Sequence, residues 1–106
     1  MVEKQIIYTL SQEKVIERLV EDDNVAINHM VLRKGEALPL HHANSNVYMI
    51  VVRGAVTLAL GDQELHVYSA GSIVLIPYQT KMDVSNQSEA VLELFVVKAP
   101  SPRHLG

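Results

Sequence analysis

Short apolar segments separated by turn-forming residues are the feature that most limits what this chain can fold into. Each segment covers only a few residues and stops at Gly, Pro, Asn or Asp, as at Asp22-Asp23-Asn24 and Gly61-Asp62. Many short strands at this spacing are typical of an antiparallel β-sandwich or barrel. We therefore predict an all-β fold with strands at Gln5–Thr9, Lys14–Glu21, Val25–Arg33, Val47–Arg53, Ala55–Leu60, Glu64–Ser69, Ser72–Ile76, Lys81–Ser85 and Ala90–Lys98.

One of these segments allows two interpretations. The apolar residues Val15, Ile16, Leu19 and Val20 also fit a helical period, so Ser11–Glu21 could be an amphipathic helix. We favour the strand.

The length and the cysteine content limit the domain organisation and the chemistry. A chain of 106 residues can bury one hydrophobic core without a disulfide. We interpret residues 1–106 as a single domain, with an N-terminal arm over 1–10 and a flexible tail over 99–106 that contains two prolines. Cysteine is absent, which excludes thiol nucleophiles, zinc–thiolate sites, iron–sulfur clusters and disulfides.

The charge pattern disfavours several classes of partner. The formal net charge is −3 and basic residues are not clustered, so we expect binding neither to nucleic acid nor to a membrane surface. The longest apolar run, VYMIVV over 47–52, is too short to cross a bilayer, and the N-terminus lacks the apolar core of a signal peptide. We therefore expect a soluble, cytoplasmic protein.

Two spaced patterns lie within about residues 25–97. Gly35 precedes His41 by six positions, and Gly54 follows His41 by thirteen. Gly71 precedes Pro77 by six positions, and Asn86 follows Pro77 by nine. This framework resembles the two motifs of the cupin superfamily. The resemblance implies a small antiparallel jelly-roll β-barrel of the RmlC-like type, and it makes a homodimer the expected assembly.

The same resemblance identifies the positions at which many cupins bind one divalent metal, through three histidines and a glutamate. The first histidine falls on His41, but the second falls on Ala43. The glutamate falls on Val47 and the last histidine on Met82. The glycine two positions after the proline falls on Gln79. Three of the four ligand positions therefore have no metal-binding nitrogen or oxygen, and we predict that the metal site has degenerated.

Strand alternation then predicts what fills the barrel. If the ligand positions still face inward, the interior is lined by a mainly apolar set with one imidazole. This set could simply fill the core, or it could bind a small apolar ligand, since Met is an adaptable packing residue. The predicted pocket consists of His41, Ala43, Val47, Met49, Met82 and Val84.

A metal site remains the alternative. It would use His41 and His42 in an unusual arrangement, with His29 as a third candidate ligand and Zn, Fe, Mn, Ni or Cu as the metal. Neighbouring residues on a regular strand point to opposite faces, so His41 and His42 could converge only on an irregular loop or bulge. The face that His29 takes is left open by the alternation.

The strand over 47–53 is apolar on both faces. Tyr48, Ile50 and Val52 face away from the predicted pocket, where an exposed strand face is normally polar. A continuous apolar outer face is typical of a partner surface, so these three residues are the predicted dimer face.

The sequence leaves three functions open. We favour a ligand-binding or non-enzymatic barrel. The alternatives are a small metal-dependent enzyme of isomerase or dioxygenase type and a dimeric interaction module.

Overall fold

The computed structural model describes residues 2–105 and contains nine strands and one short helix in that range. The elements are β1 (Val15–Glu21), β2 (Ala26–Leu32), β3 (His41–His42), β4 (Val47–Arg53), β5 (Ala55–Leu60), β6 (His66–Ser69), β7 (Ile73–Ile76), β8 (Lys81–Ser85), β9 (Leu92–Lys98) and α1 (Pro102–Leu105).

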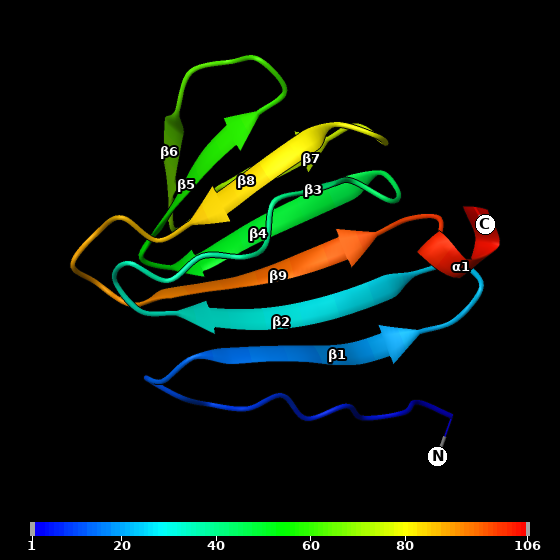
Figure 1. Ribbon diagram of the computed structural model, residues 1–106. Coiled ribbons are helices and arrows are strands. Elements are labelled where there is room, and N and C mark those ends of the chain that lie inside the picture. The colour runs from blue at the N-terminus through cyan, green and yellow to red at the C-terminus, as the bar shows by residue number, and fades with distance from the viewer. Residues whose placement is uncertain (1, 106) are drawn as a thin grey trace.

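The strands form two antiparallel sheets. The larger sheet has the order β1-β2-β9-β4-β7, and the smaller sheet has the order β3-β8-β5-β6. Figure 1 shows β1, β2, β9 and β4 side by side, with the N-terminal arm running beside β1. Sequence-distant strands therefore become neighbours, as β2 and β9 do, and the all-β jelly-roll prediction is confirmed.

The core lies between the two sheets. On β4, Val47, Met49 and Val51 are fully buried, and on β8 Met82 and Val84 are buried while Lys81 and Asp83 are exposed. This alternation is the one predicted from the sequence, and it orients the family's ligand positions toward the interior.

Some local predictions need correction. The segment 11–21 contains strand β1 and no helix, so the favoured interpretation was right. The prediction of a strand over Gln5–Thr9 was wrong, because no β-ladder pairs this segment with β1. Thr9 instead donates hydrogen bonds from its backbone N–H and its hydroxyl to the Glu17 carboxylate. Strand β3 was missed, since two residues carry no readable period.

The C-terminal segment packs against the barrel. Ser101 is fully buried, and the Ser45 hydroxyl donates a hydrogen bond to the Pro100 carbonyl. The Arg103 guanidinium lies 3.1 Å from the Asp23 carboxylate. These contacts lie within residues 99–103, and α1 follows at Pro102–Leu105. The flexibility of the tail over 99–106 stays a prediction.

Within residues 2–105 no helix is long and apolar enough to cross a membrane.

Candidate functional site

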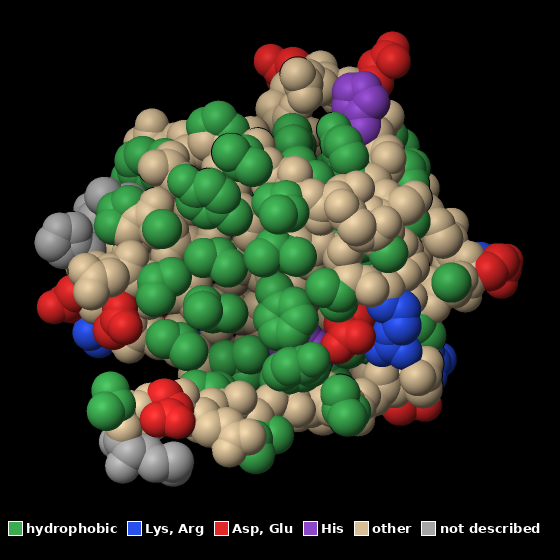
Figure 2. Space-filling view, turned by 180° about the vertical axis from the view of Figure 1, so that it is seen from behind, with side chains coloured by type: hydrophobic (Ala, Val, Ile, Leu, Met, Phe, Trp, Pro, Cys, Tyr) green, Lys and Arg blue, Asp and Glu red, His purple; other side chains and the backbone are tan. Residues whose placement is uncertain are grey.

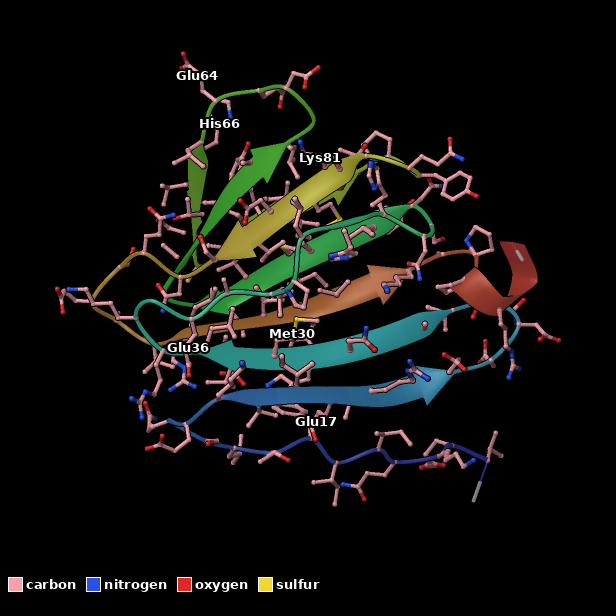
Figure 3. The ribbon with its side chains drawn as sticks, in the orientation of Figure 1. Glu17, Met30, Glu36, Glu64, His66 and Lys81 are labelled. Carbon is pink, nitrogen blue, oxygen red and sulfur yellow. The ribbon has the colours of Figure 1, made fainter. Side chains whose placement is uncertain are left out.

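A small cavity opens at one end of the barrel, between β2, β9 and β4 of the larger sheet and β3 and β8 of the smaller one. Its volume is about 40 Å³. We call it the mouth cavity, and its lining consists of Asn28, Met30, Leu38, His41, Ala43, Asn44, Val47, Met49, Met82, Val96 and Lys98. Figure 3 shows Met30 on β2 within the barrel, whereas Glu64 and His66 lie far from it at the β5–β6 turn.

Most of the predicted pocket residues meet in this cavity. His41, Ala43, Val47, Met49 and Met82 all line it, while Val84 is buried deeper in the core and does not. The remaining lining residues were missed.

The missed residues include two polar side chains that face the cavity. Lys98 follows Leu92, Leu94 and Val96 at intervals of two on β9, and these three are buried. Asn28 precedes Met30 by two on β2 in the same way. The alternation of each strand could have revealed them, because a polar residue that continues an inward-facing series points inward too.

Neither of these two polar side chains has enough hydrogen-bonding or charged partners in the protein. The Asn28 Oδ1 atom is buried and accepts no hydrogen bond from a described residue. Lys98 is half-buried, and burial lowers the pKa of its ammonium; the Arg18 guanidinium lowers it further, and Glu21 partly offsets both effects. The mouth cavity therefore combines an apolar interior with the Asn28 oxygen, which has no hydrogen-bond donor among the described residues, and the Lys98 ammonium, whose charge is only partly balanced.

The two adjacent histidines lie on β3 and have different surroundings. His41 pairs with Met82 across the β3–β8 ladder, and His42 pairs with Lys81. Both histidines are exposed, but only His41 lines the mouth cavity. The His41 Nδ1 atom lies 2.8 Å from the Pro39 carbonyl oxygen and can donate a hydrogen bond to it, which leaves Nε2 free.

The family's metal positions do not fit a metal here. His41 is the one imidazole among them, and Ala43, Val47 and Met82 are buried beside it with a methyl, an isopropyl and a thioether group. A divalent ion normally needs three or four protein nitrogen, oxygen or thiolate ligands. The donor set is too small for such an ion.

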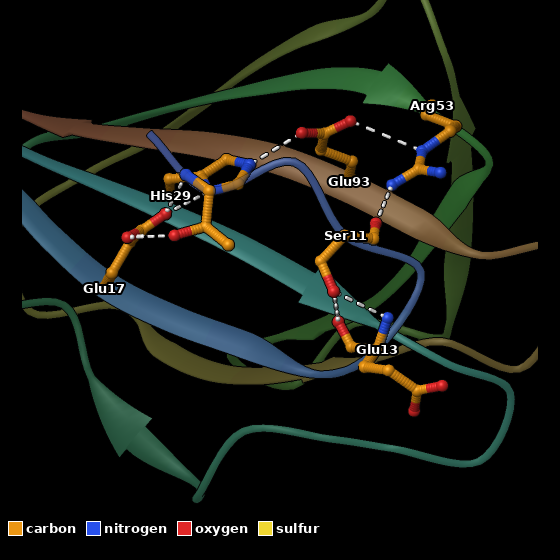
Figure 4. A network of polar contacts seen from close by, with 7 residues as sticks. Ser11, Glu13, Glu17, His29, Arg53 and Glu93 are labelled. Atoms are coloured by element: carbon orange, nitrogen blue, oxygen red, sulfur yellow. Dashed lines mark hydrogen bonds and ion pairs between the residues drawn. The ribbon is translucent and has the colours of Figure 1, made fainter. Parts of the chain in front are cut away.

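His29 lies on the opposite face of the larger sheet from the mouth cavity. Its side chain is fully buried, with Nδ1 2.7 Å from Glu17 Oε2 and Nε2 2.6 Å from Glu93 Oε2. The rings of Tyr8 and Phe95 pack against it at centroid distances of 4.7 and 4.9 Å. Figure 4 shows how Glu93 also connects to Arg53, at 3.3 Å.

His29 therefore does not join His41 and His42, so the alternative metal set predicted from the sequence is not brought together. Among the side chains of residues 2–103, no group of three or more His, Asp or Glu residues has an arrangement that could hold a metal ion. His29 instead contacts Glu17, and Glu17 accepts both hydrogen bonds from Thr9 of the N-terminal arm, so His29 helps to hold the arm on the sheet.

The outer face of the larger sheet is apolar, as Figure 2 shows from behind the view of Figure 1. The predicted dimer face lies here: Tyr48 and Ile50 are half-buried and Val52 is 46% exposed. The register places Leu75 beside Tyr48 and Ile73 beside Ile50. The exposed apolar side chains that extend this face are Ile6, Ile7 and Leu10 of the arm and Ile73 and Leu75 of β7.

Comparison with known proteins adds a close relative. No family model matches the chain. An uncharacterized protein of Methanocaldococcus jannaschii is 47% identical over 95 residues, which span 90% of this chain and 82% of the relative. A crystal structure from the same organism, described as an RmlC-like cupin family protein with a double-stranded β-helix fold, superposes with a TM-score of 0.96 at 45% identity, covering 99% of this chain and 97% of that one.

More distant structures share the fold. A cupin superfamily protein of Desulfitobacterium hafniense has a TM-score of 0.73 at 11% identity, covering 88% of this chain and 83% of its own. A cupin-like protein of Thermotoga maritima has a TM-score of 0.76 at 20% identity, covering 86% and 70%. Together with the two-sheet topology and the close relative, these matches place the chain in the RmlC-like cupin family.

Proposed function

We propose that this cupin is a non-catalytic barrel that binds a small molecule in the mouth cavity, where metal-binding cupins hold their metal. The observation that carries this proposal is the lining of the cavity: apolar side chains surround an amide oxygen without a partner and a half-buried ammonium group. Ligand sites commonly have this composition, a mainly apolar wall with a few polar groups that fix orientation.

The size of the cavity limits the ligand. A volume of about 40 Å³ is room for roughly three water molecules, at about 10–15 Å³ each. The proposed ligand therefore has only a few non-hydrogen atoms. Met30, Met49 and Met82 lie in the wall, and their unbranched side chains can adjust to a slightly larger occupant.

A thermal-shift and calorimetric screen tests the proposal. The probes are acetate, glycolate, glycolamide, ethanol and ethylammonium, at matched ionic strength. Any probe that binds the native state stabilises it according to its concentration relative to Kd. At least one probe should raise the melting temperature of the unmodified protein in a saturable manner.

The matched variant is Ala43→Val, which adds two methyl groups to the cavity wall. It should abolish the shift, while Ala59→Val, on the half-buried part of β5 and outside the cavity lining, should retain it. Failure of every probe, or equal shifts in both variants, would refute binding in the mouth cavity.

A second candidate function is assembly with another copy of the same chain, favoured by the apolar outer face of the larger sheet. We propose a second copy as the occupant because this face is uncharged over Tyr48, Ile50, Val52, Ile73 and Leu75. Placed against itself about a twofold axis, it brings apolar groups together and sets no like charges opposite each other. Dimerisation and ligand binding use opposite faces of the sheet, so both can hold.

A further inference from the structure

The ligand's chemistry can be narrowed from the polar groups of the mouth cavity, and this step rests on the proposed function. The first group is Lys98, at the last position of β9. The register pairs it with Ala26 on one side and Val47 on the other, and both of these residues are buried. Lys98 therefore ends the inward-facing row of β9 and lies half-buried in the lining of the mouth cavity.

The charge around Lys98 is positive and not balanced. Among residues 2–105, no carboxylate forms an ion pair with Lys98. The nearby Glu21 carboxylate already lies 3.2 Å from Arg18, the second cation near this end of the barrel. An anionic group at the rim would supply the missing counter-charge to Lys98.

The second group is the Asn28 amide. It lies two register positions deeper than Lys98, because Asn28 pairs with Val96 whereas Ala26 pairs with Lys98. Its Oδ1 atom is buried without a hydrogen-bond donor among the described residues. A buried acceptor of this kind is costly unless a donor reaches it, so an occupant should bring an O–H or N–H group.

We infer that the mouth cavity binds a 2-hydroxy carboxylate of two or three carbons. The carboxylate lies at the rim beside the Lys98 ammonium, and the hydroxyl points inward and donates a hydrogen bond to Asn28 Oδ1. The carbon chain contacts Met30, Met49 and Met82. With the carboxylate at the open rim, only the short carbon chain and the hydroxyl enter the small cavity, and the two polar groups of the ligand match Lys98 and the Asn28 oxygen.

Calorimetric titration of the unmodified protein tests this assignment with three probes of nearly equal size. Glycolate carries both the carboxylate and the hydroxyl, acetate lacks the hydroxyl, and glycolamide lacks the charge. Glycolate should bind about tenfold or more tightly than either analogue, because a site built to pair a polar group rejects a ligand that lacks it.

Two variants assign the contacts. Lys98→Met should weaken glycolate binding by about tenfold or more, whereas Lys34→Met should leave it unchanged, because Lys34 lies on an exposed turn in an ion pair with Glu89. Asn28→Leu should erase the preference for glycolate over acetate. The three-probe series needs no mutation, so it stands even if a variant fails to fold.

The outcomes separate the two proposals. If glycolamide or acetate binds as tightly as glycolate and Ala43→Val abolishes that binding, the cavity binds small molecules but the 2-hydroxy carboxylate assignment is wrong. If neither these probes nor those of the wider screen bind, both proposals fall. Glycolate binding that survives Lys98→Met and Asn28→Leu also overturns the assignment.

Discussion

At the residue scale, two turn positions show how backbone geometry constrains the sequence. Gly54 joins β4 to β5 with φ of +74°, and a Cβ built on it would lie 2.3 Å from the Val91 carbonyl oxygen. This contact is with backbone, which cannot rotate away as a side chain could. Gly54 is therefore required both by its positive φ and by the close approach of the chain before β9.

Gly54→Ala should destabilise the protein by about 2–3 kcal/mol, since it combines left-handed strain with a backbone clash. Gly61→Ala is the control: Gly61 has φ of +57° but open space around it, so its cost should be only about 1 kcal/mol. Urea denaturation of the two variants measures the difference. Equal losses would show that the clash with Val91 is relieved at no cost.

Gln79 occupies a position where the cupin motif has glycine. Its φ is +71°, and it lies in the turn closed by the hydrogen bond from Thr80 N–H to the Pro77 carbonyl. The same turn is fixed to the mouth of the barrel, because the Gln79 N–H donates to the Ala43 carbonyl. The chain thus tolerates a strained residue next to the candidate site.

Gln79→Gly should stabilise the protein by up to about 1 kcal/mol, because the relief of left-handed strain exceeds the added backbone entropy of the unfolded chain. Tyr78→Gly, one position earlier and without a positive φ, should destabilise it instead. Thermal and urea unfolding check the signs. A destabilised Gln79→Gly protein would mean that the glutamine side chain contributes more than the strain costs.

At the element scale, the N-terminal arm is held on the outer face of the larger sheet by polar contacts. Glu17 on β1 accepts hydrogen bonds from the Thr9 N–H at 2.9 Å and from the Thr9 hydroxyl at 3.0 Å, and it also contacts His29. Arg53 on β4 donates to the Ser11 carbonyl at 2.8 Å. The arm needs no β-ladder, because side chains from β1 and β4 supply its hydrogen-bond partners and the ring of His29 on β2 packs against Tyr8.

This attachment should weaken in acid. The Thr9 N–H first, and His29 second, hold the pKa of Glu17 below its ordinary value near 4.5. A carboxyl with a lowered pKa in the folded state contributes stability that is present above the ordinary value and is lost as the pH falls through the lowered one. The protection of the Thr9 amide, its exchange rate compared with the intrinsic rate at the same pH, should therefore decrease in that acidic range.

Glu17→Gln should lower the protection of the Thr9 amide at neutral pH and remove the acid dependence of that protection. Glu13→Gln, whose carboxylate lies 2.7 Å from the exposed Arg33, is the control and should behave like the unmodified chain. If the Thr9 amide exchanges equally fast in all three proteins, the arm is held by its apolar contacts and not by Glu17.

At the scale of the whole molecule, the two faces of the larger sheet have different surroundings. The inner face closes the core and carries Asn28 and Lys98 at the mouth cavity, whereas the outer face carries the arm, His29 and the apolar surface around Ile50. Assembly and metal binding at the family's ligand positions each depend on several strands at once.

The unmodified protein should have twice the mass of one chain in light scattering at micromolar concentration. Ile50→Asp should yield monomer, because it would put an unpaired charge into an apolar contact. Val67→Asp is the matched control: Val67 is 60% exposed on the smaller sheet, away from this face, and the variant should stay dimeric. A clean monomer in the unmodified protein would refute the proposed assembly.

Restoring the family's ligands tests whether the strands still hold the metal geometry. Ala43→His, Val47→Glu and Met82→His together would complete a four-ligand set with His41, and His41 lies directly opposite Met82 in the β3–β8 ladder. The triple variant should gain affinity for Zn²⁺ or Ni²⁺ and be stabilised by the added metal.

Met82→His alone should bind no metal and should lose about 1–3 kcal/mol of stability if the imidazole is buried without a hydrogen-bond partner. Metal titration followed by thermal unfolding separates the two variants. A triple variant that folds yet binds metal no better than the parent would show that the two motifs were aligned wrongly.

The sequence by itself determined most of the strand segments, the main turns and the family, but it wrongly made Gln5–Thr9 a strand and missed β3. Alternation over Val47–Arg53 and Lys81–Ser85 was sufficient to predict which side chains face inward, and the glycine, proline and asparagine spacing identified the cupin framework. These features are local, because the facing of a residue on a strand depends on its neighbours, and a turn depends on the φ that its own residues can adopt. Five of the six predicted pocket residues therefore line the cavity.

Only the tertiary structure decided which side chains meet. The face of His29, the side-chain attachment of the arm and the meeting of Asn28 with Lys98 all depend on β2 pairing with both β1 and β9. Asn28 and Lys98 are 70 positions apart in the sequence, and no local periodicity can specify that their strands become neighbours. The charge balance at Lys98 likewise sums contributions from β1 and β9. Which distant strands pair in the sheet is decided by the packing of the whole chain, and the candidate ligand site depends on that pairing.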